Sequence, residues 1–259
     1  MVGIYVETTV AADVPAVWRT TQEPTSHVRW DLRFSSIVPT SRDTDGRWTF
    51  RYSLRLLGID VGGTGVSIGE TARPDGTRTS ALRFESAHPL SPLRSGSGYW
   101  RYVPGEAGTR FVTGFDYEPG WGPLGRAVDP WALRPLTGWL TALSFDTLRL
   151  WLEDGFTPEQ TRRRGGADLA ARALLVGCVS AAAHRLGRGG AVAVAAAAVV
   201  GTVVASRLPT PRGVPRAGRC RRSPDRVLAR PPRTLATLAA DPDVDGHADA
   251  HADARRSAS

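Results

Sequence analysis

The sequence predicts an α+β fold in which a curved antiparallel sheet wraps one long C-terminal helix. A helical membrane hairpin and a disordered basic tail are expected to follow. Three observations lead to this prediction: apolar residues alternate in short stretches between residues 4 and 117, residues 129–153 show helical periodicity, and every aromatic residue lies at or before Phe156. A period of two is typical of half-buried strands and a period near 3.6 of amphipathic helices. The 259 residues therefore divide into an aromatic-rich domain, 1–156, and a tail of different character.

Six or seven strands are predicted before the long helix. The expected strands lie around residues 4–10, 32–37, 48–54, 82–84 and 111–117, with further pairing partners between them. The turn-forming stretches D-T-D-G (43–46), P-D-G (74–76) and P-G-E-A-G (104–108) predict hairpins. Two short helices are expected between the first two strands, the first capped by Asp13 and the second starting at Pro24 and ending before Trp30. Such spacing indicates an antiparallel meander.

The stretch 57–70 changes the side on which its apolar residues fall. Ile59 and Val61 occupy odd positions, whereas Val66 and Ile68 occupy even ones. A one-residue bulge at Gly62-Gly63 would explain the change and would curl the sheet. These glycines do not form G-x-G-x-x-G or a Walker loop, so they do not predict a nucleotide site.

Residues 129–153 are predicted to form the helix around which the sheet curves. Its apolar stripe comprises Leu133, Leu136, Trp139, Leu140, Leu143, Leu150 and Trp151, with Arg134, Thr137, Thr141 and Ser144 largely opposite. Asp129 is the expected N-cap with Pro130 in the first position, and Asp154-Gly155 is the expected stop. The stripe is expected to face the sheet and to leave room for a ligand between them.

Residues 3–154 resemble the START/Bet v 1-like superfamily, also called SRPBCC, and within it the polyketide cyclase/dehydrase-like group. Three stretches carry the resemblance: I-Y-V-E-T-T-V-A-A-D-V-P-A-V-W-R (4–19), H-V-R-W-D-L-R-F (27–34) and F-D-Y-E-P-G-W-G-P-L-G-R (115–126). The resemblance implies a helix-grip fold with a cavity between sheet and helix, used for lipids, polyketides or other apolar molecules. It implies no shared catalytic motif for this chain.

The expected cavity lining consists of inward-facing apolar and aromatic side chains: Trp48, Phe50, Tyr52, Phe84, Tyr102, Phe111, Phe115, Tyr117, Leu136, Trp139 and Leu143. Among the tyrosines, Tyr52, Tyr99, Tyr102 and Tyr117 are candidates to hydrogen-bond a ligand oxygen, with ordinary core packing as the competing interpretation. His27, close to Asp31, is a candidate general base, but a surface or capping histidine is the favoured interpretation. Asp116 and Glu118 are expected to be solvated. The sequence predicts no catalytic set, no cofactor and no metal site.

The chain after residue 156 is predicted to be a membrane attachment. A linker is expected at 157–166 and one or two Ala/Val-rich membrane helices at 167–206. Residues 189–206 contain 18 residues without a charge, which span about 27 Å against a hydrocarbon core of about 30 Å. Two spans joined at 184–190 would form a hairpin, while a single span, an in-plane or re-entrant hairpin, and a pair of helices packed in water stay open as alternatives.

The basic character belongs to the tail. Residues 1–156 hold 16 Arg against 17 acidic residues, whereas residues 157–259 hold 17 Arg against 8. Nine Arg lie in 207–233 with one acid, so the tail, 207–259, is predicted to be disordered and drawn to anionic lipid headgroups. Nucleic acid is the rival partner, which the absence of interleaved aromatics disfavours. The final H-A-D-A repeats, with His247, Asp249, His251 and Asp253, are interpreted as solvated filler instead of a metal site.

Location and function follow from these features. The start of the chain lacks the charged and apolar segments of a signal peptide, and arginines flank the predicted hairpin. We therefore expect a cell-membrane protein with the first domain and the tail on the cytoplasmic side. The favoured function is membrane-tethered binding of an apolar molecule, such as a lipid, quinone or polyketide. The alternatives are a cyclase or dehydratase and a structural membrane protein with a filled cavity.

Overall fold

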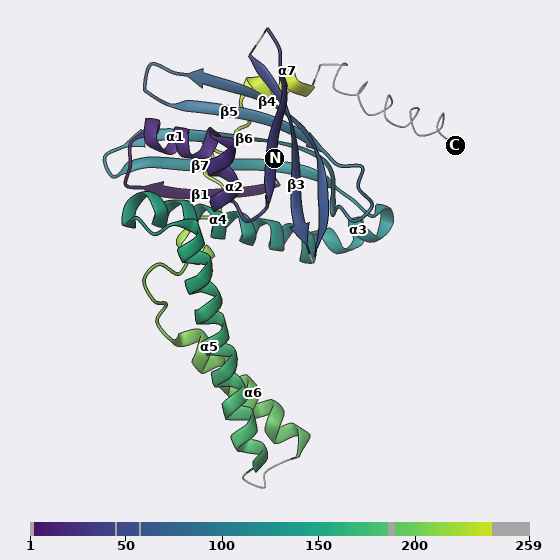
Figure 1. The fold of residues 1–259 in the computed structure, drawn as a ribbon, viewed down its shortest axis with the longest axis vertical. Helices are drawn as coiled ribbons and strands as arrows, with labels where there is room; N and C mark the ends of the chain where they lie inside the picture. The colour runs from purple at the N-terminus through teal and green to yellow at the C-terminus, as the bar shows by residue number, and fades with distance from the viewer. Residues whose placement is uncertain (1–2, 45, 57, 186–189, 240–259) are drawn as a thin grey trace. The chain divides into compact units, whose positions relative to one another are not determined.

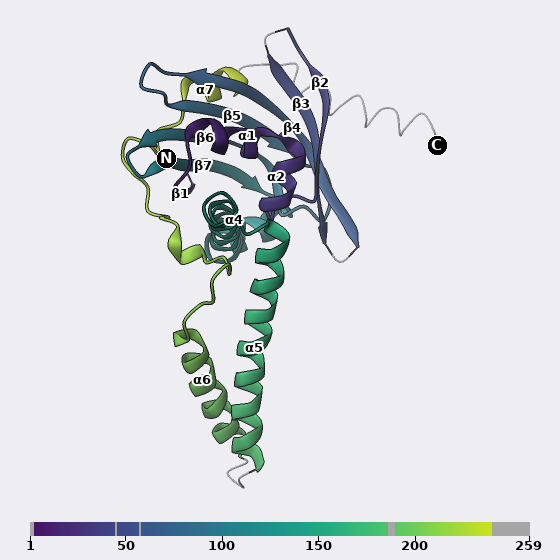
Figure 2. The same cartoon turned by 60° about the vertical axis from the view of Figure 1, so that its left-hand side comes forward.

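The computed structural model describes residues 3–44, 46–56, 58–185 and 190–239, and its two compact units are shown in Figures 1 and 2. The first unit comprises Met1–Glu153 together with Arg216–Ser259. The second comprises Asp154–Pro215. The chain therefore leaves the first unit and returns to it.

The first unit is a seven-stranded antiparallel sheet with helices. Its elements before the long helix are β1 (Ile4–Val10), α1 (Val14–Gln22), α2 (Pro24–Trp30), β2 (Ser36–Arg42), β3 (Arg47–Leu56), β4 (Ile59–Ala72), β5 (Arg78–Glu85), β6 (Leu93–Gly105) and β7 (Gly108–Pro119). The order across the sheet is β1-β7-β6-β5-β4-β3-β2, so consecutive strands pair and β1 closes onto β7. The predicted meander of strands is confirmed.

Local sequence signals explain where these elements begin and turn. The Asp13 carboxylate accepts a hydrogen bond from the Ala16 amide at 2.8 Å and caps α1 as predicted. Gly46, Gly76 and Gly108 adopt φ values of 81°, 79° and 111° in the three expected hairpin turns. Because such φ values are strained for residues with a Cβ, glycine at these positions favours the observed turns.

The predicted bulge at Gly62-Gly63 is wrong. Residues 59–68 of β4 pair with β3 in unbroken register, and the irregularity in β4 lies between Ile68 and Thr71. A Cβ on Gly65 would lie 2.4 Å from Cζ of Phe50. A Cβ on Gly63 would lie 2.7 Å from the Tyr52 hydroxyl oxygen. The apolar residues change faces here because aromatic rings from β3 occupy the space above these glycines.

The long helix begins earlier than predicted. It consists of α3 (Gly122–Val128), a π-helical turn η1 (Asp129–Leu133) and α4 (Arg134–Asp154). Asp129 is therefore inside the helix and is not its N-cap. Its carboxylate accepts hydrogen bonds from the Tyr117 hydroxyl at 2.6 Å and from Nε of Arg134 at 2.9 Å. The predicted stop is confirmed, since α4 ends at Asp154 and Gly155 has a φ of 71°.

The face of α4 that packs on the sheet is the predicted stripe only in part: Leu150 is buried and Leu143 and Trp151 pack against the core cluster, but part of the first half of the stripe is exposed. Buried positions include Gly138, Thr141, Ala142, Phe145 and Leu148. Thr141 and Ser144, expected on the opposite side, are completely buried, whereas Leu136 and Trp139 are 53% and 45% exposed. The rings on the sheet are large, so the helix approaches it with mostly small side chains and with the ring of Phe145.

The predicted disorder of the tail is wrong for its first part. Residues 216–239 belong to the first unit, and α7 (Arg233–Ala239) lies against β4, β5 and β6. Arg221 exchanges backbone hydrogen bonds with Glu7 on β1, at 2.8 and 2.9 Å, which covers the free edge of that strand. Arg101 donates to the Leu228 and Arg230 carbonyls at 2.6 and 3.0 Å. The expectations for 240–259, including the histidines, lie outside the described residues.

The second unit is a helical hairpin. It contains α5 (Pro158–Arg185) and α6 (Ala191–Arg207), and the expected linker at 157–166 is instead the start of α5. The helices are antiparallel: the Arg172 side chain donates to the Ala205 carbonyl near one end, and Gly201 lies against Val176 further along. Among the described residues, α5 is the one helix whose length and composition suffice to cross a membrane, and α6 is apolar but shorter.

Candidate ligand site on the inner face of the sheet

The cross-strand register places all eight strand residues of the predicted lining on one face of the sheet. Phe50 pairs with Gly65, Gly65 with Phe84, Phe84 with Gly96, and Gly96 with Tyr117. Directly opposed residues share a face, and residues two apart on a strand share it too. This face, here called the inner face, also carries Trp48, Tyr52, Tyr102, Phe111 and Phe115.

Half of these residues belong to the closed core. Tyr102, Phe111, Phe115 and Tyr117 are buried in the main apolar cluster. The ring of Phe111 stacks on that of Phe145 from α4, with centroids 4.4 Å apart. The Tyr102 hydroxyl lies 2.6 Å from the Thr21 hydroxyl, and burial raises the pKa of this phenol. These side chains join the sheet to its helices and line no open surface.

The other half forms a partly accessible row. We define the aromatic row as these four residues, Trp48, Phe50, Tyr52 and Phe84, together with Phe34 from the connection between α2 and β2; Phe50 is buried and the others are half-buried. Ring centroids are 4.9 Å apart for Trp48 and Phe50, 5.7 Å for Phe34 and Tyr52, and 6.5 Å for Tyr52 and Phe84. The row is a continuous aromatic surface on the inner side of β3 and β5.

Glycine backbone underlies the aromatic row. A Cβ on Gly96 would lie 2.4 Å from Cζ of Phe84, just as Gly65 makes room for Phe50. The rings therefore lie close to the backbone of the neighbouring strand. Such an arrangement presents ring faces and edges, which suits contact with an apolar molecule.

One polar group accompanies the row. The Tyr52 hydroxyl donates to the Glu85 carbonyl at 3.2 Å. Burial, with a smaller contribution from the Glu85 charge, raises the pKa of Tyr52, so its phenol stays protonated at neutral pH. The phenol oxygen keeps acceptor capacity, which a ligand hydroxyl could use.

A buried charged cluster lies beside the row. His27 Nε2 is 3.2 Å from Asp31 Oδ2, and the His27 ring is 5.3 Å from that of Phe34. Asp31 is completely buried and accepts two side-chain hydrogen bonds from Arg33, at 2.9 and 2.6 Å. Burial alone would raise the pKa of Asp31, but the charge and hydrogen bonds of Arg33, with those of His27, hold it well below the usual range. The cluster therefore contains a fixed carboxylate.

The sequence interpretation missed several residues that shape this site. Trp30 and Trp100 fill the space beside the row, with ring centroids 6.0 Å apart, and the His27 ring lies 5.1 Å from that of Trp30. Ser144 of α4 lies 3.2 Å from Asp31 Oδ1. The alternation of Trp100 with Gly98 and Tyr102 on β6 was a usable signal for Trp100. No sequence pattern indicated that Ser144 meets Asp31, because 113 positions separate them. The Ser144 hydroxyl also accepts a hydrogen bond from the Leu32 amide at 2.9 Å.

Three predicted site residues lie elsewhere. Tyr99 is on the outer face, where its hydroxyl donates to the Leu228 carbonyl at 2.7 Å. Leu136 and Trp139 are exposed on the helix and do not reach the inner face of the sheet as expected. Leu143 is half-buried against the core cluster. Asp116, expected to be solvated, is exposed and pairs with Arg134 at 2.7 Å.

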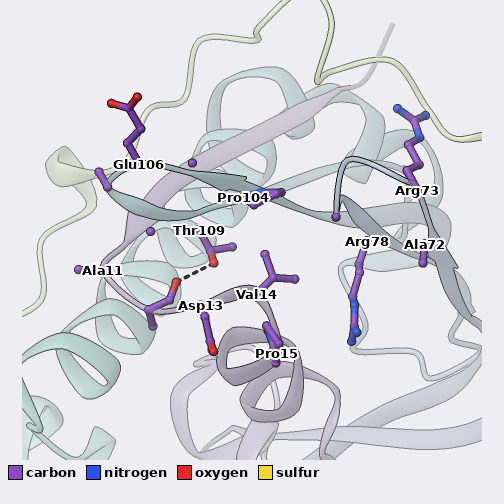
Figure 3. Close-up of a pocket in the computed structure, with 15 residues that line it drawn as sticks. Ala11, Asp13, Val14, Pro15, Ala72, Arg73, Arg78, Pro104, Glu106 and Thr109 are labelled. Carbon is purple, nitrogen blue, oxygen red and sulfur yellow. Dashed lines mark hydrogen bonds between the residues drawn. The ribbon is translucent and has the colours of Figure 1, made fainter.

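A separate hollow of about 930 Å³ lies at the rim of the sheet, as Figure 3 shows. Its walls come from the β1–α1 connection and from the β4–β5 and β6–β7 turns. Ala, Gly and Pro residues supply most of the lining, and the Thr109 hydroxyl donates to the Ala12 carbonyl at 2.7 Å. The Asp13 carboxylate already accepts a hydrogen bond from the Ala16 amide as the N-cap of α1. This hollow lacks an aromatic surface, so the aromatic row is the better candidate site for an apolar ligand.

A curved antiparallel sheet around a long helix, with an aromatic inner face, defines a helix-grip domain of the START/Bet v 1-like superfamily. Residues 1–153 match the family described as polyketide cyclase/dehydrase and lipid transport. The match covers more than half of the chain, and the protein belongs to this family. Its domain is a fold for binding hydrophobic ligands.

The chain is also similar to individual proteins. The chain is 43% identical over 159 residues to the uncharacterized membrane protein YndG of Bacillus subtilis, covering 61% of this chain and 59% of that protein. It resembles a STAR-related lipid transfer protein from Xanthomonas axonopodis, with 15% identity, 57% and 84% coverage and a TM-score of 0.43. It also resembles the Zhui aromatase/cyclase from Streptomyces sp. R1128, with 15% identity, 56% and 94% coverage and a TM-score of 0.37.

Proposed function

We propose that this protein binds an apolar small molecule at the aromatic row while the α5–α6 hairpin anchors the domain in the cell membrane. The observation that carries the proposal is the accessible part of the inner face. Trp48, Tyr52 and Phe84 stay half-buried although they belong to the same face of the sheet as the closed core, and Phe34 beside them is half-buried too. A ligand covering them would remove apolar surface from water, at about 25 cal/mol per Å².

The anchor contributes through proximity. Apolar ligands are concentrated in the bilayer, and a tethered site meets them at a higher effective concentration than a free one. The relative from Bacillus subtilis is named as a membrane protein, and α5 has the length and composition of a membrane span. A lipid, a quinone or a polyketide-like molecule would fit this chemistry.

Replacing Phe84 by Ala is expected to weaken ligand retention. Loss of a ring that covers part of the ligand removes roughly 1.5–3 kcal/mol of the binding free energy that comes from buried apolar surface, which lowers the affinity by a factor of about ten to a hundred. Native mass spectrometry of the full chain, purified from membranes in mild detergent, should show a bound species of defined mass in the wild type and reduced occupancy in Phe84→Ala.

Val38→Ala serves as the matched control for this experiment. Val38 is exposed and pairs with Arg51 on the outer face, so the ligand occupancy of Val38→Ala should equal that of the wild type. An empty wild-type domain would contradict the binding proposal and favour a structural membrane protein. Equal losses in both variants would show that the aromatic row is not the site.

A cyclase or dehydratase is the second candidate, and the His27–Asp31 pair is the observation that favours it. Catalysis would use His27 as acid or base next to the row, with Asp31 orienting the ring. Asp31 is, however, already held by Arg33 and Ser144. The cluster is therefore well explained as structural support, and binding remains the favoured function.

The proposal places both ends of the hairpin on the cytoplasmic side. Residues 1–153 and 216–239 pack in one unit, so the chain enters and leaves the hairpin from the same body. Arginines precede the apolar part of α5 at 162–164 and follow α6 from Arg207 onward. Cytoplasmic flanks rich in arginine are the general tendency of membrane proteins.

Tag accessibility tests this topology. Small tags at the two termini of the full chain are expected to be unlabelled by an impermeant reagent in intact cells and labelled after permeabilisation. A tag inserted between α5 and α6 reports whether the hairpin crosses: labelling from outside indicates two spans, and protection indicates a re-entrant hairpin. External labelling of only one terminus would contradict the hairpin.

A further inference from the structure

One side of the long helix exposes an unusual amount of apolar surface. The exposed fractions are 44% for Trp121, 65% for Leu124, 72% for Trp131, 53% for Leu136 and 45% for Trp139. We call these five residues the tryptophan face. The other tryptophans, Trp18, Trp30, Trp48, Trp100 and Trp151, are buried or half-buried. A grouped set of exposed apolar side chains indicates an interaction site.

Spacing along the helix places four of these residues on one side, and Trp121 immediately precedes α3 as its N-cap. Leu124 and Trp131 are seven residues apart, Trp131 and Trp139 are eight apart, and Leu136 precedes Trp139 by three. These intervals are those of a single helical stripe. The helical hydrogen-bonded path is continuous from α3 through η1 to α4, so the stripe runs along the start of the long helix. It forms a ridge directed away from the aromatic core.

Two local details show that the tryptophan face presents carbon instead of polar atoms. The Trp131 indole N–H donates to the Ala127 carbonyl at 2.8 Å, so its one polar group is satisfied within the helix. Trp121 has a φ of 58°, which is uncommon for a bulky residue, and its side chain is nevertheless largely exposed. Burial of the Trp121 side chain does not compensate for this uncommon backbone conformation, and such a conformation indicates a functional role such as contact with a partner.

We propose that the tryptophan face contacts the membrane bilayer in which the hairpin is anchored. The inference rests on the proposed function, because it requires the tether. Residues 155–157 join α4 to α5, so the two helices are at most roughly 15 Å apart along the chain. The long helix is thereby joined by a short connection to the hairpin that the proposal places in the bilayer. Tryptophan is enriched at membrane interfaces, where its ring meets both acyl chains and headgroups.

Membrane contact would make the long helix an interfacial element. Apolar faces of interfacial helices enter the headgroup boundary by roughly 5–10 Å, a depth that side chains of Trp and Leu can reach. The same helix carries Phe145 and Leu148 in the core of the ligand domain. The helix would therefore link the bilayer surface with the domain that binds the apolar ligand.

Tryptophan quenching tests this contact in the full chain. The protein is reconstituted in nanodiscs of phosphatidylcholine and phosphatidylglycerol, with and without bromine on the phosphatidylcholine acyl chains. We expect brominated lipid to quench part of the tryptophan emission. The triple variant Trp121→Phe, Trp131→Phe and Trp139→Phe should lose most of this quenching while keeping an apolar face and the same circular dichroism spectrum.

Trp18→Phe is the matched control. Trp18 lies outside the aromatic row and packs against the core cluster, with its ring centroid 5.0 Å from that of Tyr102, so its replacement should leave the lipid-dependent quenching unchanged. Full quenching in the triple variant would overturn the inference, as would emission that iodide quenches but brominated lipid does not. A dimer in native mass spectrometry that the triple variant abolishes, without lipid quenching, would assign the face to a second copy and overturn it too.

The experiment separates this inference from the membrane tether. Co-migration of the protein with nanodiscs in size-exclusion chromatography shows that the hairpin is inserted in the bilayer. This readout does not depend on the tryptophan face, because α5 and α6 are unchanged in every variant. A chain that does not co-migrate would contradict the tether itself. A chain that co-migrates without lipid quenching would leave the tether in place and refute the tryptophan face as a membrane contact.

Discussion

Replacing Phe145 by Ala is expected to lower the free energy of unfolding of the first unit by about 3–5 kcal/mol. Phe145 is completely buried, and its ring stacks on Phe111 at 4.4 Å and meets Trp30 at 6.2 Å. Alanine would leave a cavity between the sheet and the long helix. Urea unfolding in mild detergent, followed by near-ultraviolet circular dichroism, measures the change.

Trp139→Ala is the matched control, because Trp139 lies on the same helix but is 45% exposed. Substitutions at exposed positions typically change stability by less than about 0.5 kcal/mol. The apolar stripe read from the sequence predicts the opposite ranking, with Trp139 as the buried anchor. A larger loss for Trp139→Ala than for Phe145→Ala would therefore contradict the observed orientation of the helix.

The helix shows why its buried face could not be predicted from its own sequence. Large apolar residues normally indicate the buried side. Here the sheet supplies the large rings of Trp100 and Phe111 and α2 supplies that of Trp30, and the helix positions Gly138 and Ala142 are small. Packing depends on the summed volume of the two partners, which periodicity within one element does not contain.

Strand order and inner face were predictable for a different reason. Alternation assigns each side chain to a face, and the short turns around Gly46, Gly76 and Gly108 force neighbouring strands to pair. All eight predicted strand residues consequently share one face. Their division into a closed core and an accessible aromatic row depends on which part of the sheet the helices cover, and alternation gives no information about that.

The tail was predicted to be disordered because its contacts with the domain are made by backbone groups and charged side chains, which form no apolar pattern in the sequence. Residues 216–232 are rich in Arg and Pro, a composition typical of disorder. The Leu228 carbonyl nevertheless accepts hydrogen bonds from Tyr99 and Arg101, and Asp146 of α4 accepts from the Arg216 amide and the Arg219 side chain. Carbonyls carry no sequence signature, so only the partners in the domain reveal the docking site.

Asp31→Ala is the second change with a large expected effect, a loss of about 3–5 kcal/mol. The aspartate is completely buried, and its removal leaves the Arg33 guanidinium, 19% exposed, without its carboxylate and leaves His27 without its partner. Asp31→Asn separates charge from shape, because it keeps the side-chain volume and removes only the negative charge. Asp60→Asn, which breaks the exposed pair with Arg55, should change stability little.

The pH dependence of unfolding identifies the Asp31 charge directly. Its pKa is well below the usual range in the folded state because Arg33 and His27 outweigh the burial that would raise it. An unfolded aspartate has a pKa of about 3.9. The contribution of Asp31 is therefore complete above about pH 5 and declines below about pH 4, where only the unfolded chain takes up the proton. In that window the wild type should lose up to about 1.4 kcal/mol per pH unit more than Asp31→Asn. Equal slopes in the two proteins would show that the charge of Asp31 does not stabilise the folded state, and the cluster beside the aromatic row would then need another explanation than an ion pair.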